Sequence, residues 1–395
     1  MDTDRTILHC DMNGFFASVE MLDHPELIDK PVAVSGDPDH RRGIILAKNE
    51  IAKRFGVSTG ETIWQAKRKC PKLVLLQSRK GLYSKYSKLA NQIYFSYTNK
   101  VEPFGIDESW LDVTASAALH GDGKTIADKI RARIKDELKL TVSVGVSFNK
   151  VFAKLASDYK KPDATTVFDR NSIESIVYNL PAASMLFVGR STAAELHKMG
   201  ISTIGDIAVF PEAPLVAKFG KHGSLMKKYA LGLDDSPVAD YGSHDPIKSI
   251  GNHITFKRDI LTCDDLKKGF AIVAQKLSQR MHRKNIQARC IQITIKRSDF
   301  TVVNRQTRLK RPTNLSSDLA EAAYKCALTC VRDGAIRMLG ISCCDLIAPD
   351  SPFQTDLFDK IDTKAVGREN AFFSVKEAFG ESSIMFGSML DNDLE

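Results

Sequence analysis

The sequence predicts a multidomain protein of mixed α/β and α+β type. Its 395 residues suggest about three domains at roughly 150 residues each. A hydrophobic content of 43% is sufficient for real cores and excludes a disordered chain. In the first half, strands and helices follow one another in the order strand, helices, strand pair, helix, strand, helix. This order favours a sheet with helices on one of its faces.

The first half contains an apolar strand over residues 6–10 that ends at Asp11. Residues 14–80 read mainly as helical, with turns at prolines and a strand-like run at 43–46. A period-two alternation over 109–113 indicates a half-buried strand. Three further segments complete this half: an amphipathic helix at 124–138, a strand at 140–146 and a helix at 149–159.

The second half begins with short helices over residues 170–232, broken by glycines. Residues 233–246 are polar, contain two prolines and predict a linker. A second folded block follows over 248–344. Its predicted elements are strands near 250–256 and 289–296 and helices near 264–283 and 316–331.

The charge is unevenly distributed. The chain has 56 Lys and Arg against 48 Asp and Glu, but the residues after 344 hold eleven acidic and four basic side chains. The basic excess is concentrated in residues 248–344. A basic body with an acidic tail suits a polyanionic partner, although a solubilising surface has the same composition.

Targeting and redox signals point to a cytoplasmic protein. No apolar run reaches the ~18 residues that span a bilayer, and the first residues lack the pattern of a signal peptide. The eight cysteines form no Cys-x-x-Cys pair. We therefore expect buried, reduced thiols rather than disulfides or a metal site.

Carboxylates stand at two strand ends. Asp11 follows the first strand, and the adjacent pair Asp107-Glu108 precedes another. In the simplest interpretation, Asp11 caps a helix and the pair decorates a turn. In the alternative, a divalent cation neutralises carboxylates that are otherwise costly to bring together. Two such ions would stabilise both oxygens of a phosphoryl displacement.

Three ordered motifs resemble those of Y-family DNA polymerases of the DinB type. The first is residues 11–20, the second is residues 106–114, and the third is residues 143–158, followed by Lys161-Pro162. The resemblance continues to about residue 345. It implies a right-hand fold with a ferredoxin-like palm at 1–13 and 77–168 and small fingers at 14–76. A thumb with a helix-hairpin-helix would follow at 169–233, and a linker at 234–242 would lead to a DNA-binding little finger at 243–345. Residues 346–395 would form an acidic tail.

The resemblance also implies an activity: template-directed, low-fidelity addition of dNMP from dNTP to a primer 3′-hydroxyl in translesion synthesis, without a proofreading exonuclease. Two Mg²⁺ ions, for which Mn²⁺ can substitute, would serve each active site. Asp11 and Asp107 would hold both ions, and Glu108 would hold the ion that activates the primer hydroxyl. The Met12 carbonyl would bind the nucleotide-side ion.

Around the nucleotide, the resemblance makes Phe16 a steric gate against the ribose 2′-hydroxyl. Lys161 would bind the triphosphate. Lys53 stands where relatives commonly carry an arginine, and it would keep a cation near the triphosphate. Glu50 stands where relatives carry a tyrosine, so no nucleotide contact is expected from Glu50. The triphosphate would also be lined by the turn residues Asn13, Gly14 and Phe15.

Contacts to DNA and to a clamp are implied in the remaining parts. The thumb would contact phosphates through Gly189, Arg190 and Ser202, and the little finger through Lys296, Arg297, Arg305, Arg308, Lys310 and Arg311. Residues 354–358 resemble the pentapeptide that binds bacterial sliding clamps, with Gln354, Leu357 and Phe358 as its anchors. We expect a monomer that binds primer-template DNA and dNTPs and borrows processivity from the clamp.

Two other functions remain compatible with paired carboxylates on a sheet. A nucleotidyl cyclase would form cyclic nucleotide from NTP alone, and the basic second block argues against it. A catalytically silent DNA-binding scaffold would have lost the carboxylates, whereas Asp11, Asp107 and Glu108 are all present.

Overall fold

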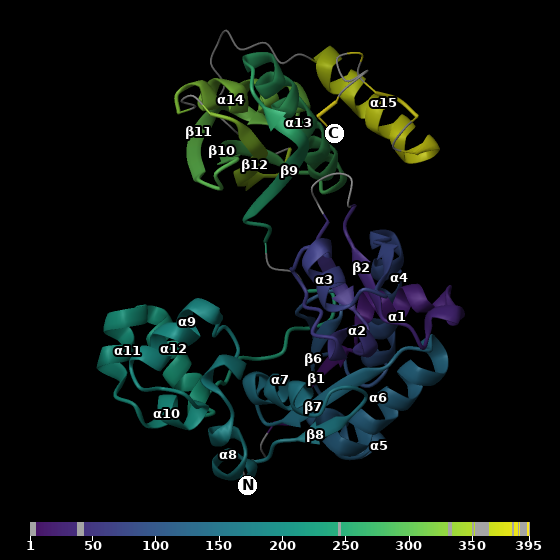
Figure 1. Ribbon diagram of the computed structural model, residues 1–395, viewed down its shortest axis with the longest axis vertical. Coiled ribbons are helices and arrows are strands. Elements are labelled where there is room, and N and C mark those ends of the chain that lie inside the picture. The colour runs from purple at the N-terminus through teal and green to yellow at the C-terminus, as the bar shows by residue number, and fades with distance from the viewer. Residues whose placement is uncertain are drawn as a thin grey trace. The chain divides into compact units, whose positions relative to one another are not determined.

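The computed structural model describes residues 5–37, 43–243, 246–330, 334–349, 351, 363–380, 383–385, 387 and 393–394 (Figure 1). The chain divides into two compact units. The first comprises Met1–Gly36 with Ile44–His244, and the second is mainly Asp245–Glu395.

A five-stranded sheet lies at the centre of the first unit. Its order is β5-β6-β1-β7-β8. The strands are β1 (Ile7–Met12), β5 (Val101–Pro103), β6 (Glu108–Asp112), β7 (Val142–Ser147) and β8 (Thr165–Val167). β1 is central and pairs antiparallel with both β6 and β7.

Helices cover both faces of this sheet, so the expectation of helices on one face is wrong. The helices α4 (Lys80–Phe95) and α6 (Gly123–Leu138) share a core with Leu8 and Cys10 of β1. On the opposite face, α7 (Lys150–Tyr159) packs on β1 and β7. It approaches closely at Gly145, where a Cβ atom would lie 2.0 Å from the Ala153 carbonyl oxygen. Because β1 is buried on both faces, its sequence shows no alternation that could have indicated this second layer.

A smaller sheet of order β3-β2-β4 lies in the segment that was expected to be mainly helical. Its strands have only four residues each, too few to show a clear periodicity. The elements of this segment are α1 (Phe15–Leu22), β2 (Val32–Ser35), β3 (Ile45–Lys48), α2 (Glu50–Arg54), α3 (Ile63–Lys69) and β4 (Val74–Gln77).

Short helices follow, in agreement with the glycine-broken pattern of residues 170–232, and they share an apolar core with α7. They are α8 (Ser172–Ser175), α9 (Arg190–Lys198), α10 (Ile204–Val209), α11 (Glu212–Phe219) and α12 (Lys221–Ala230). The one-turn helix α5 (Ala117–His120) lies earlier in the chain, directly before α6. After α12 the chain returns to the large sheet, where Val238 is buried beside Trp110.

The second unit is a four-stranded antiparallel sheet of order β11-β10-β12-β9. Two helices pack on it and on each other. Its elements are β9 (Ser249–Ile260), α13 (Cys263–Arg283), β10 (Gln287–Arg297), β11 (Val302–Thr313), α14 (Ser316–Leu328) and β12 (Ile336–Ile347). β11 had not been predicted, because this edge strand is largely exposed and rich in polar residues.

The C-terminal segment adds α15 (Thr363–Phe379), where the sequence had suggested a helix only near 374–379. This helix docks on the second unit. The buried Glu369 accepts hydrogen bonds from the Ser316 amide and the Ser278 hydroxyl, and Glu377 pairs with Arg283. The Leu394 carbonyl accepts a hydrogen bond from the β9 residue Lys257. The clamp-like residues 354–358 lie outside the described residues.

All eight cysteines are free thiols, and most of them are buried. Within the described residues, no helix combines the length and apolar character needed to cross a membrane.

Candidate active site

Strand pairing brings the two carboxylate segments together. In the register of β1 and β6, Asp11 lies opposite Glu108. The Met12 amide donates a hydrogen bond of 3.1 Å to the Asp107 carbonyl. Asp11 is only 6% exposed, and Asp107 and Glu108 are half-buried. The carboxylates that the sequence singled out therefore meet at one end of adjacent strands.

Two lysines neutralise these carboxylates. Lys161 Nζ lies 2.6 Å from Asp11 Oδ2, and Lys154 Nζ lies 2.8 Å from Glu108 Oε2. Lys161 also pairs with Asp158 at 2.7 Å. In the described part of the chain, no three His, Cys, Asp or Glu side chains are already grouped as a metal site. The two lysine ammonium groups instead form ion pairs with carboxylate oxygens that a metal cation would need.

Burial and neighbouring charges separate the pKa values of the three carboxyl groups. Burial raises the pKa of Asp11 to about 6, against the lowering effect of Lys161. Burial and the Glu108 charge also raise the pKa of Asp107. Burial would raise the pKa of Glu108 as well, but the neighbouring His9 and the hydrogen bond and charge of Lys154 outweigh it and lower this pKa to about 2. Three converging carboxylates supply the hard oxygen donors that suit a divalent cation, so the donor set fits Mg²⁺.

His9 is a member of this site that the sequence analysis missed. It is fully buried, and its Nδ1 atom lies 2.8 Å from the Ser157 hydroxyl. Its Nε2 atom lies 3.5 Å from Glu108 Oε2, a long distance for a hydrogen bond. Burial lowers the pKa of His9 to about 4, so the ring is neutral at physiological pH. Its position two residues before Asp11, on the same face of β1, was the available signal.

The two adjacent phenylalanines of α1 have different environments. Phe15 is buried in the core beneath the sheet, whereas Phe16 is half-buried. The Phe16 ring stacks on Tyr83 with centroids 4.1 Å apart and an interplanar angle of 9°. This stacking fixes the ring that was expected to be the steric gate.

Tyr83, which the sequence analysis also missed, is itself held by a buried carboxylate. Its hydroxyl donates a 2.5 Å hydrogen bond to Glu20, which is 2% exposed. Arg79 donates to the other oxygen of Glu20 at 2.7 Å and also pairs with Asp23. The ring on which Phe16 stacks thus belongs to a network that joins α1 to α4.

The turn between β1 and α1 depends on Gly14. Its φ of +51° lies in the left-handed region, and a Cβ atom would lie 3.0 Å from the Lys48 carbonyl oxygen. The side chain of the preceding Asn13 is held by two hydrogen bonds. Its Nδ2 group donates to the Ser143 hydroxyl, and its Oδ1 atom accepts from the backbone amide of Asp163. No side chain caps the N-terminus of α1, so its amides are available to an anion.

The predicted cation in α2 is only partly available. Lys53 pairs with Glu50 at 3.3 Å, and both side chains are largely exposed. Lys48 donates a hydrogen bond to Thr59, and burial lowers its pKa. Glu50 therefore competes with any phosphate for Lys53.

The two predicted phosphate-binding turns differ. Gly189 is the N-cap of α9 and gives it no side-chain cap, and Arg190 is exposed. At the second turn, by contrast, the Ser202 and Thr203 amides both donate to the Asp206 carboxylate. The amides of the first turn are open to a phosphate, and those of the second are already occupied by an acid.

The basic residues of the second unit lie on β10 and β11. Arg305, Arg308 and Lys310 are exposed. Lys296 packs over the Phe300 ring at 4.7 Å, and Arg311 pairs with Asp318. Arg297 is half-buried at the end of β10. Three of the six predicted phosphate contacts are thus fully presented to solvent.

Family models match both units. The model of the impB/mucB/samB family matches residues 10–158, and that of the impB/mucB/samB family C-terminal domain matches residues 247–357. Among solved structures, a Y-family DNA polymerase chimera of Dbh and Dpo4 is similar in fold, with a TM-score of 0.77 and 24% sequence identity. The match covers 87% of this chain and 99% of that chain.

Curated relatives are similar along nearly the whole chain. DNA polymerase IV of Acetivibrio thermocellus is 45% identical over 98% of both chains. DNA polymerase IV of Moorella thermoacetica is 35% identical, covering 97% of this chain and 96% of that protein. The corresponding protein of Desulfatibacillum aliphaticivorans is 34% identical over 90% of this chain and 89% of its own length.

Proposed function

Because the chain belongs to the impB/mucB/samB family and is a DNA-directed DNA polymerase, we propose that it is an error-tolerant enzyme that extends primers across damaged templates. The observation that carries the proposal is the pairing of Asp11 against Glu108, with Asp107 beside them. It supports a reaction in which a primer 3′-hydroxyl attacks the α-phosphate of a dNTP and pyrophosphate leaves.

Asp11 and Asp107 would hold two Mg²⁺ ions, with Glu108 as a further ligand on the primer side and the Met12 carbonyl on the nucleotide side. Such ions lower the barrier by neutralising charge on the attacking and leaving oxygens. The protein contributes a rigid frame: β1, β6 and β7 fix the carboxylates, and His9 lies against Glu108. Lys154 and Lys161 keep the carboxylates neutralised in the absence of cations.

The nucleotide would occupy the turn at Asn13 and Gly14. The uncapped amides of α1 and the Phe15 backbone would line its triphosphate, and Lys161 would turn from Asp11 toward the phosphates. Phe16, stacked on Tyr83, would press against the sugar C2′ position. Lys53 would approach the triphosphate once released from Glu50.

In this proposal the five-stranded sheet with α4, α6 and α7 is the palm, and the smaller sheet is the fingers. Helices α8–α12 form the thumb, which contacts phosphates mainly at Gly189 and Arg190. The second unit is the little finger, in which Arg305, Arg308 and Lys310 bind the DNA backbone. Phosphate contacts of this kind carry affinity without reading sequence.

The polymerase would act as a cytoplasmic monomer. Residues 354–358 would bind a bacterial-type sliding clamp, with Leu357 and Phe358 filling an apolar pocket and Gln354 bonded at its edge. The support for this part is the sequence motif alone.

Lesion bypass tests the proposal. Primer extension with Mg²⁺ and dNTPs should continue past a single abasic site in the template and yield full-length product. On an undamaged template the product should contain frequent mismatches, and the labelled primer should not be shortened from its 3′ end. Products that stop one nucleotide before the abasic site would refute the damage-tolerance proposal while leaving the polymerase activity itself in place.

Cation binding should depend on pH through Asp11. Its pKa of about 6 means that below this pH a cation must displace a proton, whereas Glu108, with a pKa of about 2, stays ionised. The Mg²⁺ concentration that gives half-maximal extension should rise about tenfold per pH unit below 6 and level off above 7. Mg²⁺ titrations between pH 5 and 8 measure this dependence. A half-maximal concentration that stays constant over this range would contradict the assignment of Asp11.

A further inference from the structure

Phe187 has an unusual backbone conformation for a bulky residue. It precedes the N-cap of α9 by two positions, and its φ of 66° lies in the left-handed region. This conformation costs free energy for any residue with a Cβ atom and is rare for large side chains. Burial does not offset the cost, because the side chain is 54% exposed. An exposed aromatic ring is therefore held in place at the expense of backbone strain.

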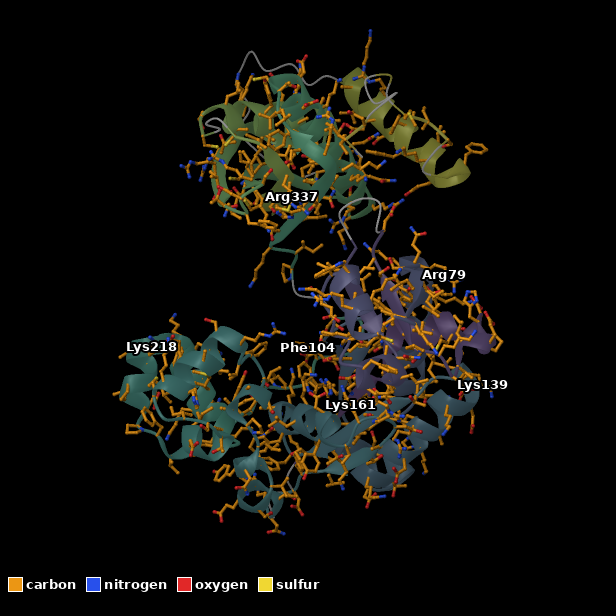
Figure 2. All side chains as sticks on the ribbon, viewed as in Figure 1. Arg79, Phe104, Lys139, Lys161, Lys218 and Arg337 are labelled. Carbon is orange, nitrogen blue, oxygen red and sulfur yellow. The ribbon has the colours of Figure 1, made fainter. Side chains whose placement is uncertain are left out.

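The Phe187 ring has an aromatic neighbour on the sheet. Phe104 lies in edge-to-face contact with it at 6.4 Å, and Phe104 is itself 43% exposed (Figure 2). Behind Phe104 stands the buried Trp110, with ring centroids 4.6 Å apart. Lys154 Nζ lies 5.9 Å from the Phe104 ring centre. Phe187 also lies 6.5 Å from the Tyr229 ring of α12. Phe104 and Phe187 each remain about half exposed, and we call these two rings the ring pair.

The ring pair lies between the carboxylate assigned to the primer and a turn assigned to a DNA phosphate. On one side, the Phe104 and Gly105 amides both donate to the Glu108 carbonyl, so Phe104 adjoins the carboxylate assigned to the primer 3′-hydroxyl. On the other side, the uncapped N-terminus of α9 at Gly189 suits a DNA phosphate. Deoxyribose is the apolar part of a DNA strand that lies between its terminal hydroxyl and its phosphates.

We propose that Phe104 and Phe187 form a binding surface for the deoxyribose rings at the primer terminus. This inference rests on the proposed function and extends it to a residue-level contact with the primer. The surface would favour a strand without 2′-hydroxyl groups, because a hydroxyl pressed against an aromatic ring loses its hydrogen bonds to water. Phe104 and Phe187 would then select for a DNA primer, as Phe16 selects for a deoxynucleotide.

The other role open to the ring pair is that of a structural latch between the sheet and helices α8–α12. The exposure of both rings argues against it, since a latch gains its stability by burying apolar surface. The two roles predict opposite effects of Phe187→Gly on stability. Relief of the strain at a positive φ should exceed the entropic cost of glycine in the unfolded chain, so removing a ring that is not a latch should stabilise the protein.

The test combines thermal unfolding with primer binding by the full chain. We expect Phe187→Gly to raise the melting temperature. Wild-type protein should bind a primer-template ending in two deoxynucleotides about tenfold more tightly than one ending in two ribonucleotides. This preference should be lost in Phe187→Gly and in Phe104→Ala, while Phe379→Ala, which removes a ring that is 77% exposed on α15, should keep it.

Two outcomes would overturn the inference. A lower melting temperature in Phe187→Gly with an unchanged sugar preference would identify a latch. An equal preference in wild type and both ring variants would show that the ring pair does not contact the primer. In either case the wild-type protein would still extend primers. Absence of extension by the wild type would instead count against the proposed function itself.

Discussion

Replacement of Asp107 by alanine should lower the rate of nucleotide incorporation on the order of 10³-fold or more. The substitution removes an oxygen donor from the site expected to bind both ions, and loss of metal-ion charge stabilisation costs several kcal/mol of barrier lowering. Affinity for primer-template should change little, because phosphate contacts elsewhere provide most of it. Single-turnover incorporation and fluorescence anisotropy measure the two quantities on the same variant.

A matched control is Asp136→Ala, which removes an exposed carboxylate from α6 on the opposite side of the sheet. It should incorporate nucleotides at the wild-type rate. Asp11→Ala and Glu108→Ala should resemble Asp107→Ala. A near wild-type rate in any of these three variants would remove that residue from the catalytic set.

Phe16→Ala should admit ribonucleotides. Removing the ring opens the space in which a ribose 2′-hydroxyl would otherwise collide with it, so discrimination against rNTPs should fall on the order of 10²–10³-fold. A loss of about 3–4 kcal/mol in differential binding corresponds to this range. Incorporation of dNTPs should fall much less. The measured quantity is the ratio of kcat/KM for a dNTP and the matching rNTP.

Tyr83→Phe is the informative companion variant. It keeps the ring on which Phe16 stacks but loses the hydrogen bond to Glu20. Sugar discrimination should therefore stay close to wild type. Phe55→Ala, which truncates an exposed ring in the same segment, should not alter it either. Unchanged rNTP exclusion in Phe16→Ala would show that the gate lies elsewhere.

Local patterns predicted the parts of the fold that local sequence determines. The apolar run before Asp11 became β1, and the alternation before Val113 became β6. Helices α6, α13 and α14 were located within a few residues, since many turns contribute to each pattern, whereas α4 (Lys80–Phe95) had not been predicted. The pairing of β1 with β6 places Asp11 beside Glu108, two residues that the motif resemblance had assigned to one site.

Features set by long-range contacts could not be predicted in the same way. His9, Lys154 and Tyr83 acquire their roles only through strand pairing and helix packing, which no local pattern encodes. In the smaller sheet only β3 had been indicated, by the strand-like run at 43–46, because four-residue strands such as β2 and β4 are too short to show a period. Likewise, α15 has almost no amphipathic pattern, and its docking depends on single contacts such as that of Glu369 with Ser316.

The most direct test of the account is a count of the ions held by the carboxylates. Mn²⁺ binding to the complex with primer-template and a non-hydrolysable dNTP can be measured by electron paramagnetic resonance. We predict two tightly bound ions per wild-type complex and loss of tight binding in Asp11→Ala and Asp107→Ala, with both ions retained in Asp136→Ala. Two tightly bound ions in the Asp107→Ala complex would show that the metal site lies elsewhere and would contradict the account.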